Sequence, residues 1–206
     1  MESKAPSKIY LPADLRLESF SSGSDWVRIH QCAQDPLFFG KTGWNRFDAP
    51  DRKEFGVLYM AKALHGALIE TLQLTHDRGF PYVTSNFLRI RCFCRIVSTE
   101  EIRLVNLTSG ASMAWLGVNG SLNSGDPSTA QRWSQAVFQH PDKPDGILYV
   151  PRHDPQQVAV ALFDRAQCKV YVSNRQEILD PTGCVAVEID QVLREYGIEI
   201  SMGSGL

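Results

Sequence analysis

Apolar residues occur mostly in short runs along this chain, with helical periodicity in only a few places. Runs of four to eight apolar or alternating residues, bounded by turn residues, are typical of strands. This pattern predicts strands at residues 26–30, 56–60, 87–97, 102–107, 147–150, 158–163, 170–172 and 185–189. Most are too short and too evenly spread to be the strands of a regular βαβ alternation.

Two longer segments have the three-to-four-residue spacing of an amphipathic helix. Residues 61–75 place Leu64, Leu68 and Leu72 on one stripe, and residues 126–139 open with Asp126-Pro127-Ser128, where a small polar residue suits a helix N-terminus. Shorter helices are predicted at 109–116 and 190–196. Short strands with two principal helices predict an α+β fold.

The 206 residues fit one domain. Residues 1–20 are polar and are predicted to be a poorly packed lead-in to a domain spanning 21–206. Residues 31–55 form an unusually long loop that is rich in aromatic side chains, and 117–125 form a second, polar loop.

A net charge of −2 gives no basic field for nucleic acid, which is therefore not expected as a direct partner. The sequence has no apolar run long enough to span a membrane, and its first residues lack the apolar core of a signal peptide. A cytoplasmic location is the expectation. Five cysteines form no regular framework, so reduced thiols are expected. Cys92 and Cys94 share one face of a strand and are interpreted as packing residues, with no metal site.

Generic nucleotide and hydrolase motifs are absent from the sequence. Three polar residues nevertheless occur where the pattern is apolar: Arg28 in a strand, Tyr59 at a strand end and Glu70 in a helix. A carboxylate among apolar residues and an arginine in a short strand both need polar partners. Together they predict one pocket for a ligand with phosphates and a cleavable sugar bond.

At these residues the chain resembles the RES-domain proteins. Glu70 follows Tyr59 by eleven residues, and the other matching stretches are Trp26-Val27-Arg28-Ile29, Gly56-Val57-Leu58-Tyr59-Met60-Ala61, Leu104-Val105-Asn106-Leu107-Thr108, Ser128-Thr129-Ala130-Gln131 and Asp145-Gly146-Ile147-Leu148-Tyr149-Val150. The resemblance implies an ADP-ribosyltransferase-like split β core with flanking helices around an NAD cleft. It also implies an enzyme that degrades NAD as its substrate, with no other cofactor. Such enzymes are typically toxins held inactive by an antitoxin, here of the Xre-like type.

The resemblance also implies roles for the three residues. Cleavage of the nicotinamide–ribose bond passes through an oxocarbenium-like state, which the Glu70 carboxylate would stabilise. Arg28 would hold the pyrophosphate or a ribose, and Tyr59 would stack on nicotinamide. The alternatives are a solvated helix glutamate, a structural ion pair and ordinary strand-end packing.

Two further assignments depend on register. Ser128 matches the family serine or is a plain helix N-cap. The family often has Gly-Arg-Trp-Asn before the tyrosine strand, whereas residues 43–48 read Gly-Trp-Asn-Arg-Phe-Asp, so either Trp44-Asn45 or Arg46 is in register. Arg46 is favoured as a second phosphate contact. The family's serine before an arginine is replaced by Pro151, which leaves Arg152 and His153 as residues of a loop rim.

The acceptor of the ADP-ribosyl group stays open between phosphate, water and a protein. A protein ADP-ribosyltransferase on the same scaffold and a catalytically silent NAD-binding module are the alternative functions.

Overall fold

In the computed structural model, residues 9–72, 74–76 and 79–201 are described. The main strands are β1 (Glu18–Phe20), β2 (Asp25–Gln31), β3 (Val57–Ala61), β5 (Arg91–Ser98), β6 (Ile102–Asn106), β7 (Gly146–Tyr149), β8 (Ala159–Phe163) and β9 (Val170–Glu177). They form one sheet in the order β1-β6-β7-β8-β3-β2-β5-β9. Only the β6–β7 pair is parallel in this sheet. A small parallel sheet joins β4 (Tyr82–Thr84) to β10 (Glu199–Ser201).

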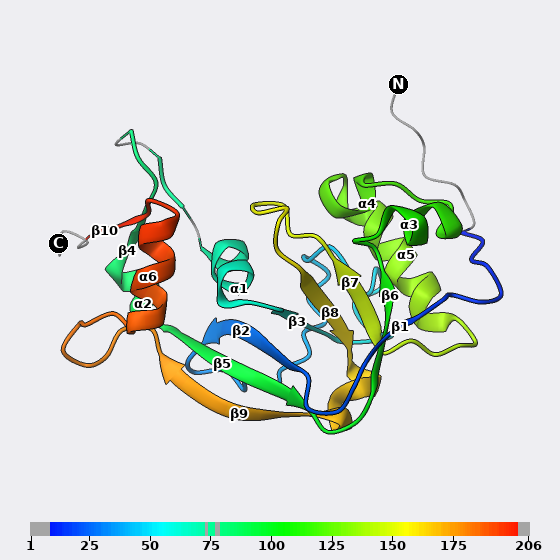
Figure 1. Ribbon diagram of the computed structural model, residues 1–206, viewed down its shortest axis with the longest axis horizontal. Helices are drawn as coiled ribbons and strands as arrows, with labels where there is room; N and C mark the ends of the chain where they lie inside the picture. Colours follow the sequence, from blue (N-terminus) through cyan, green and yellow to red (C-terminus); the bar gives the residue numbers. More distant parts are fainter. Residues whose placement is uncertain (1–8, 73, 77–78, 202–206) are drawn as a thin grey trace.

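The large sheet divides between β2 and β3. These strands share a single register pair, Val27 with Ala61, whereas β2 pairs with β5 along its whole length and β3 does the same with β8. Figure 1 shows the resulting halves, with β2, β5 and β9 in one and β6, β7 and β8 in the other. The predicted α+β fold with a split β core is therefore confirmed.

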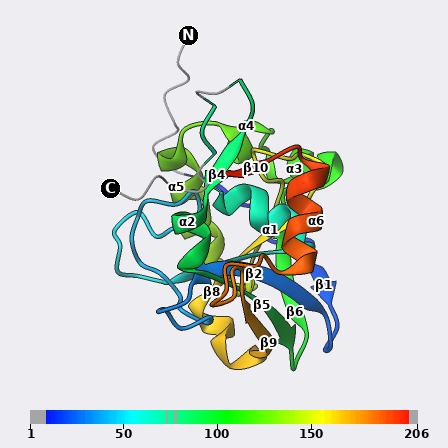
Figure 2. The same ribbon diagram turned by 90° about the vertical axis from the view of Figure 1, so that its left-hand side faces the viewer.

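The helices form two groups. α1 (Leu64–Thr71), α2 (Ser85–Arg89) and α6 (Val187–Glu195) lie over the β2–β5–β9 half. α3 (Gly110–Leu116), α4 (Ser121–Ser124) and α5 (Pro127–Gln139) lie beside the other half (Figures 1 and 2). A 3₁₀ helix, η1 (Asp164–Lys169), connects β8 to β9. Among the helices of the described residues, none has the length and apolarity required to cross a bilayer.

Buried side chains pack in two clusters, and β3 contributes to both. Val57 and Ala61 belong to the larger cluster, while Leu58 and Met60 belong to the smaller one. Such alternation buries both faces of the strand. The backbone of Tyr59 is consequently fixed at the centre of the fold.

The predicted helix over 61–75 is wrong at both ends. Ala61 is still in β3, where it pairs with Val27 and Ala159, and α1 runs only from Leu64 to Thr71. Sheet pairing takes priority over helical periodicity at the start of this segment. The Leu64 and Leu68 stripe itself does pack in the larger cluster.

Two predicted strands are partly helical. Residues 85–89 form α2, because Thr84 Oγ1 accepts the backbone N–H of Phe87 and caps a helical turn, and β5 begins only at Arg91. Residues 187–189 begin α6 instead of forming a strand, and Ile189, Val192 and Leu193 are buried along one helix face. Short β-branched runs do not distinguish a strand from a buried helix.

The described part of the predicted lead-in is better packed than expected. Leu15 is completely buried, and its backbone N–H donates to the Asp142 carboxylate at 3.0 Å. Residues 18–20 form β1 at the sheet edge. The segment 9–20 is thus part of the folded domain, while residues 1–8 lie outside the described residues.

The expectation of reduced cysteines and of a simple packing role for Cys92 is also wrong. Cys92 forms a disulfide with Cys32, 60 residues away. Cys92 lies in β5 opposite His30, near the end of β2, and Cys32 follows that strand. The two cysteines are far apart in the sequence, and only the register between β2 and β5 brings them together. Cys94 is free and buried, as expected of a packing residue.

Candidate active site

A cavity of about 350 Å³ lies where the sheet divides. Its walls come from β2, β3 and α1, from the loop after β7 and from segments near residues 45 and 123. The polar and aromatic residues that line it include Arg28, Trp44, Asn45, Arg46, Tyr59, Glu70, Asn123, Tyr149 and Arg152. Four of the five residues predicted for the site therefore share one cavity.

Arg28 enters the cavity from the middle of β2. Its Nη1 donates to the backbone oxygen of Tyr59 at 3.0 Å. Its Nε is buried and has no hydrogen-bond partner within the part of the chain that the structure describes. Burial lowers the pKa of Arg28, whereas electrostatic interactions with Cys94 and Asp35 raise it by a smaller amount. A guanidinium nevertheless stays protonated in proteins, so Arg28 is a cation held by a neutral carbonyl.

Tyr59 is fixed by the buried carboxylate of Asp48. The Tyr59 hydroxyl donates to Asp48 Oδ1 at 2.9 Å and accepts the backbone N–H of Phe47 at 3.0 Å. Burial, and then the charge of Asp48, raise the pKa of Tyr59 well above its usual value. Tyr59 is therefore neutral, and its side chain is held in a fixed position in the cavity lining.

Asp48 also organises the loop before β3. Its Oδ2 accepts hydrogen bonds from Thr42 Oγ1 at 2.8 Å and from the backbone N–H of Asn45 at 3.1 Å. Only 1% of Asp48 is exposed, so these hydrogen bonds replace water around the carboxylate. The loop places Trp44, Asn45 and Arg46 together in the lining, although the sequence suggested that only one register could do so.

Arg46 is anchored to the segment that carries α4. Its Nη1 donates to the backbone oxygens of Leu122 at 3.3 Å and Gly125 at 2.8 Å. Burial lowers the pKa of Arg46, and the charge of Arg152 lowers it further. Arg46 and Arg152 are thus two cations that line the same cavity and repel each other.

Glu70 lies near the end of α1 and is half-buried. Its Oε1 accepts the backbone N–H of His153 at 3.2 Å. Burial first, and then the charge of Glu70, raise the pKa of Tyr149, which also lines the cavity. The carboxylate is consequently directed at the cavity lining and is not a fully solvated helix side chain.

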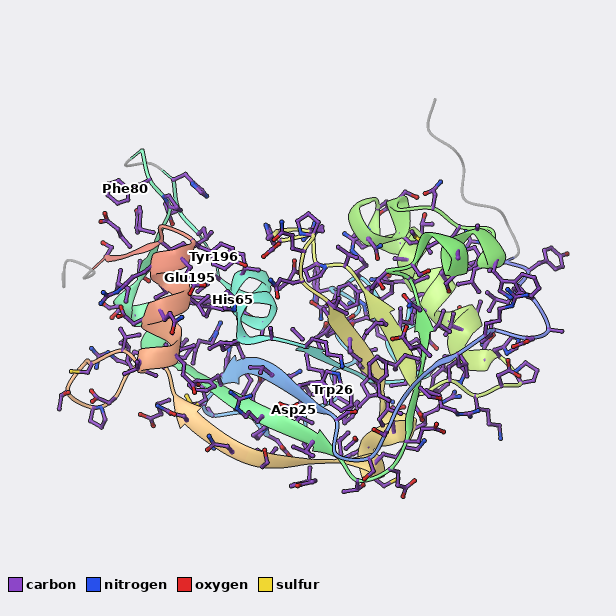
Figure 3. All side chains as sticks on the ribbon, viewed as in Figure 1. Asp25, Trp26, His65, Phe80, Glu195 and Tyr196 are labelled. Atoms are coloured by element: carbon purple, nitrogen blue, oxygen red, sulfur yellow. A yellow bond between two sulfur atoms is a disulfide. The ribbon has the colours of Figure 1, made fainter. Side chains whose placement is uncertain are left out.

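Two contacts fix the helix that carries Glu70. Gly66 lets α1 pack closely against its neighbours, because a Cβ there would lie 3.1 Å from the Gln157 Cβ and 3.3 Å from the Cβ of Ala61 in β3. At the outer side, His65 Nε2 lies 2.6 Å from Glu195 Oε2 of α6. Figure 3 labels both residues and the neighbouring Tyr196. α1 is held from both sides.

Ser128 is the predicted site residue that the structure does not bring into the cavity lining. Its hydroxyl and backbone N–H both donate to the carboxylate of Asp126, which is the N-cap of α5. Pro127, one residue earlier, does line the cavity.

Sequence reasoning missed three lining residues. The sequence places Tyr149 in a strand, Arg152 on a loop rim and Asn123 in a polar loop, and gives none of them a role in a site. For Tyr149 and Arg152 the sequence does contain a signal, because a tyrosine ends an apolar strand and an arginine follows directly after Pro151.

Within the part of the chain that the structure describes, three guanidinium groups and one carboxylate line the cavity at the division of the sheet, which makes this a small α+β protein with a positively charged candidate site. The chain belongs to the RES domain family, whose model matches residues 25–183.

Two individual proteins are similar to this chain, one in sequence and one in fold. The chain is 26% identical over 122 residues to "Probable toxin y4kH" of Sinorhizobium fredii (strain NBRC 101917 / NGR234), covering 59% of this chain and 91% of that protein. A chain in the crystal structure of the M. tuberculosis MbcT–MbcA toxin–antitoxin complex has a similar fold. The TM-score is 0.62 at 15% identity, over 80% of this chain and 88% of that one.

Proposed function

We propose that the protein degrades NAD by cleaving the bond between nicotinamide and ribose. The observation that carries this proposal is that Glu70, Arg28 and Arg46 line one cavity. A single carboxylate among guanidinium groups suits a substrate that carries negative phosphates and develops positive charge at a sugar carbon.

In this reaction the C1′–N bond breaks and its electron pair stays on the nicotinamide nitrogen. Positive charge then builds up on the ribose, and the Glu70 carboxylate stabilises it. An oxygen of phosphate or water forms the new bond to C1′ and loses its proton to solvent. The products are nicotinamide and either ADP-ribose phosphate or ADP-ribose.

The arginines and Tyr59 position the substrate. Arg28 is pinned by the Tyr59 carbonyl, which leaves its remaining N–H groups for a phosphate or a ribose oxygen. The Tyr59 ring is held by Asp48 and offers a fixed surface for the nicotinamide. Preorganisation of this kind lowers the cost of binding.

The biological role that fits this activity is that of a toxin acting on the cytoplasmic NAD pool. Support comes from family membership and from the relative named as a probable toxin. The similar fold was found in a toxin–antitoxin complex, which favours an antitoxin as partner here, with the Xre-like type as the specific proposal.

The test is to incubate purified protein with NAD, with and without phosphate, and to follow nicotinamide release. Release that increases with phosphate identifies a phosphorylase, and release without phosphate identifies a glycohydrolase. Release that occurs only with protein acceptors identifies a protein ADP-ribosyltransferase. Glu70→Gln should release nicotinamide far more slowly than the wild type, while Glu188→Gln, on the exposed face of α6, is the matched control. NAD binding without any release by the wild type would contradict the proposal.

A further inference from the structure

Arg152 lines the cavity, yet neither the motif comparison nor the proposed chemistry gives it a role. It lies three residues after the end of β7, directly behind the buried Pro151. The backbone N–H of the next residue, His153, donates to Glu70. The backbone beside Arg152 is therefore tied to the carboxylate, while its own side chain is exposed at the cavity wall.

Arg46 and Arg152 are close enough for the charge of Arg152 to lower the pKa of Arg46. Among the described residues, no carboxylate forms a salt bridge with either guanidinium. Arg46 is anchored only by neutral carbonyl oxygens, and Asp126, which senses its charge, is exposed and hydrogen-bonded to Ser128. The charge of Glu70 favours the Arg46 cation, but one carboxylate does not neutralise two guanidinium groups, and an anion that binds between them relieves the remaining repulsion.

The charge of the lining sets the kind of anion. Counting the described residues, three guanidinium groups and the Glu70 carboxylate give the lining a formal charge of +2. A group with two negative charges neutralises that excess, and phosphate oxygens match the planar fork of an arginine.

We infer that Arg152 and Arg46 together form a subsite for a phosphate group, with Arg152 as the specificity residue. This inference rests on the proposed function for the identity of its ligand. The same chemistry has two sources, the pyrophosphate of NAD and a free phosphate that serves as acceptor.

The experiment measures nicotinamide release by Arg152→Ala and Arg152→Lys. One series varies NAD at saturating phosphate, a second varies phosphate at saturating NAD, and a third omits phosphate. Arg194→Ala is the matched control, because it removes another exposed arginine, on α6 and outside the cavity lining.

We expect Arg152→Ala to raise the KM for either NAD or phosphate by roughly 10- to 100-fold, because one charge-assisted hydrogen bond is lost. A higher KM for phosphate alone assigns the subsite to the acceptor. A higher KM for NAD that persists without phosphate assigns it to the pyrophosphate. Arg152→Lys should recover part of the loss. Values of both KM within twofold of wild type, as expected for Arg194→Ala, would overturn the inference.

A binding measurement separates this inference from the proposed function. Calorimetry with inorganic pyrophosphate should show binding to the wild type and at least tenfold weaker binding to Arg152→Ala. If pyrophosphate binds in this way but NAD is not cleaved, the subsite stands and the proposed function fails. If NAD is cleaved but Arg152→Ala behaves as wild type in every series, only the subsite fails.

Discussion

The side chain of Arg28 donates to the backbone oxygen of Tyr59 over 3.0 Å, across the line where the two halves of the sheet separate. Only one residue earlier, Val27 still pairs with Ala61. Beyond that pair the side chain of Arg28 reaches Tyr59, and its guanidinium is fixed at the cavity by the division of the sheet itself. The feature that splits the fold also places a cation in the site.

Arg28→Ala should reduce kcat/KM for nicotinamide release by roughly 10- to 100-fold, because a charge-assisted contact to substrate is lost. Arg28→Lys should recover only part of this, since an ammonium cannot hold the Tyr59 carbonyl and a substrate oxygen with the geometry of a planar fork. Steady-state kinetics with NAD measure both. Full recovery by lysine would show that charge alone matters, and unfolding of Arg28→Ala in thermal melts would assign the residue a structural role.

Glu70→Gln should retain the fold and reduce nicotinamide release by roughly 10²- to 10³-fold, because a neutral amide does not stabilise positive charge on the ribose. The amide oxygen still accepts from His153, so the melting temperature should change little. Rate and melting temperature are measured on the same sample. A variant with wild-type turnover would remove Glu70 from the mechanism.

The parts of the site on regular elements were predictable from sequence. Arg28 and Tyr59 are polar residues in apolar strands, and Glu70 is a carboxylate among apolar residues of a helix. Each therefore stands out from the residues around it in the sequence. The split of the sheet could be predicted only from the family resemblance, because strand periodicity does not specify which strands pair.

The residues missed by sequence reasoning lie in loops or depend on register. Asp48 was not singled out, since its role depends on Tyr59 lying beside it in space, eleven residues away. The Cys32–Cys92 disulfide likewise depends on the β2–β5 register. Ser128 was a plausible anion contact at a helix start, but Asp126 occupies its hydroxyl.

Asp48→Asn should lower the free energy of unfolding by about 1–3 kcal/mol, because its amide nitrogen cannot accept the hydrogen bonds that the carboxylate accepts. Tyr59→Phe removes one of those donors, so the two changes should be non-additive by at least ~0.5 kcal/mol. Urea unfolding of both single variants and the double variant measures this coupling. Simple additivity would show that the 2.9 Å contact does not couple the two residues energetically.

Cys94 should resist alkylation in the native protein, although it is a free thiol. Burial raises its pKa from 9.0 to about 11, and only the thiolate reacts. The unfolded thiol ionises at lower pH than the folded one, so stability should fall as pH rises from 9 to 11. Iodoacetamide at pH 8 followed by peptide mass spectrometry should find label on the exposed Cys168 and Cys184. Equal labelling of Cys94 without denaturant would contradict its burial.

Expression of the wild type alone in a bacterium should arrest growth, with intracellular NAD falling before viability does. The physical reason is that an enzyme which turns over NAD without regulation drains a pool that its host must regenerate.

The matched strain expresses Glu70→Gln, which should keep the fold and the ligand cavity but not the carboxylate. It should grow normally and hold its NAD level. NAD and colony counts are followed over time in both strains, with protein amounts equalised by immunoblot. Identical growth and identical NAD would reject the toxin role while leaving ligand binding intact. Arrest in both strains without loss of NAD would assign the toxicity to something other than this cavity, because the two proteins differ only at its single carboxylate.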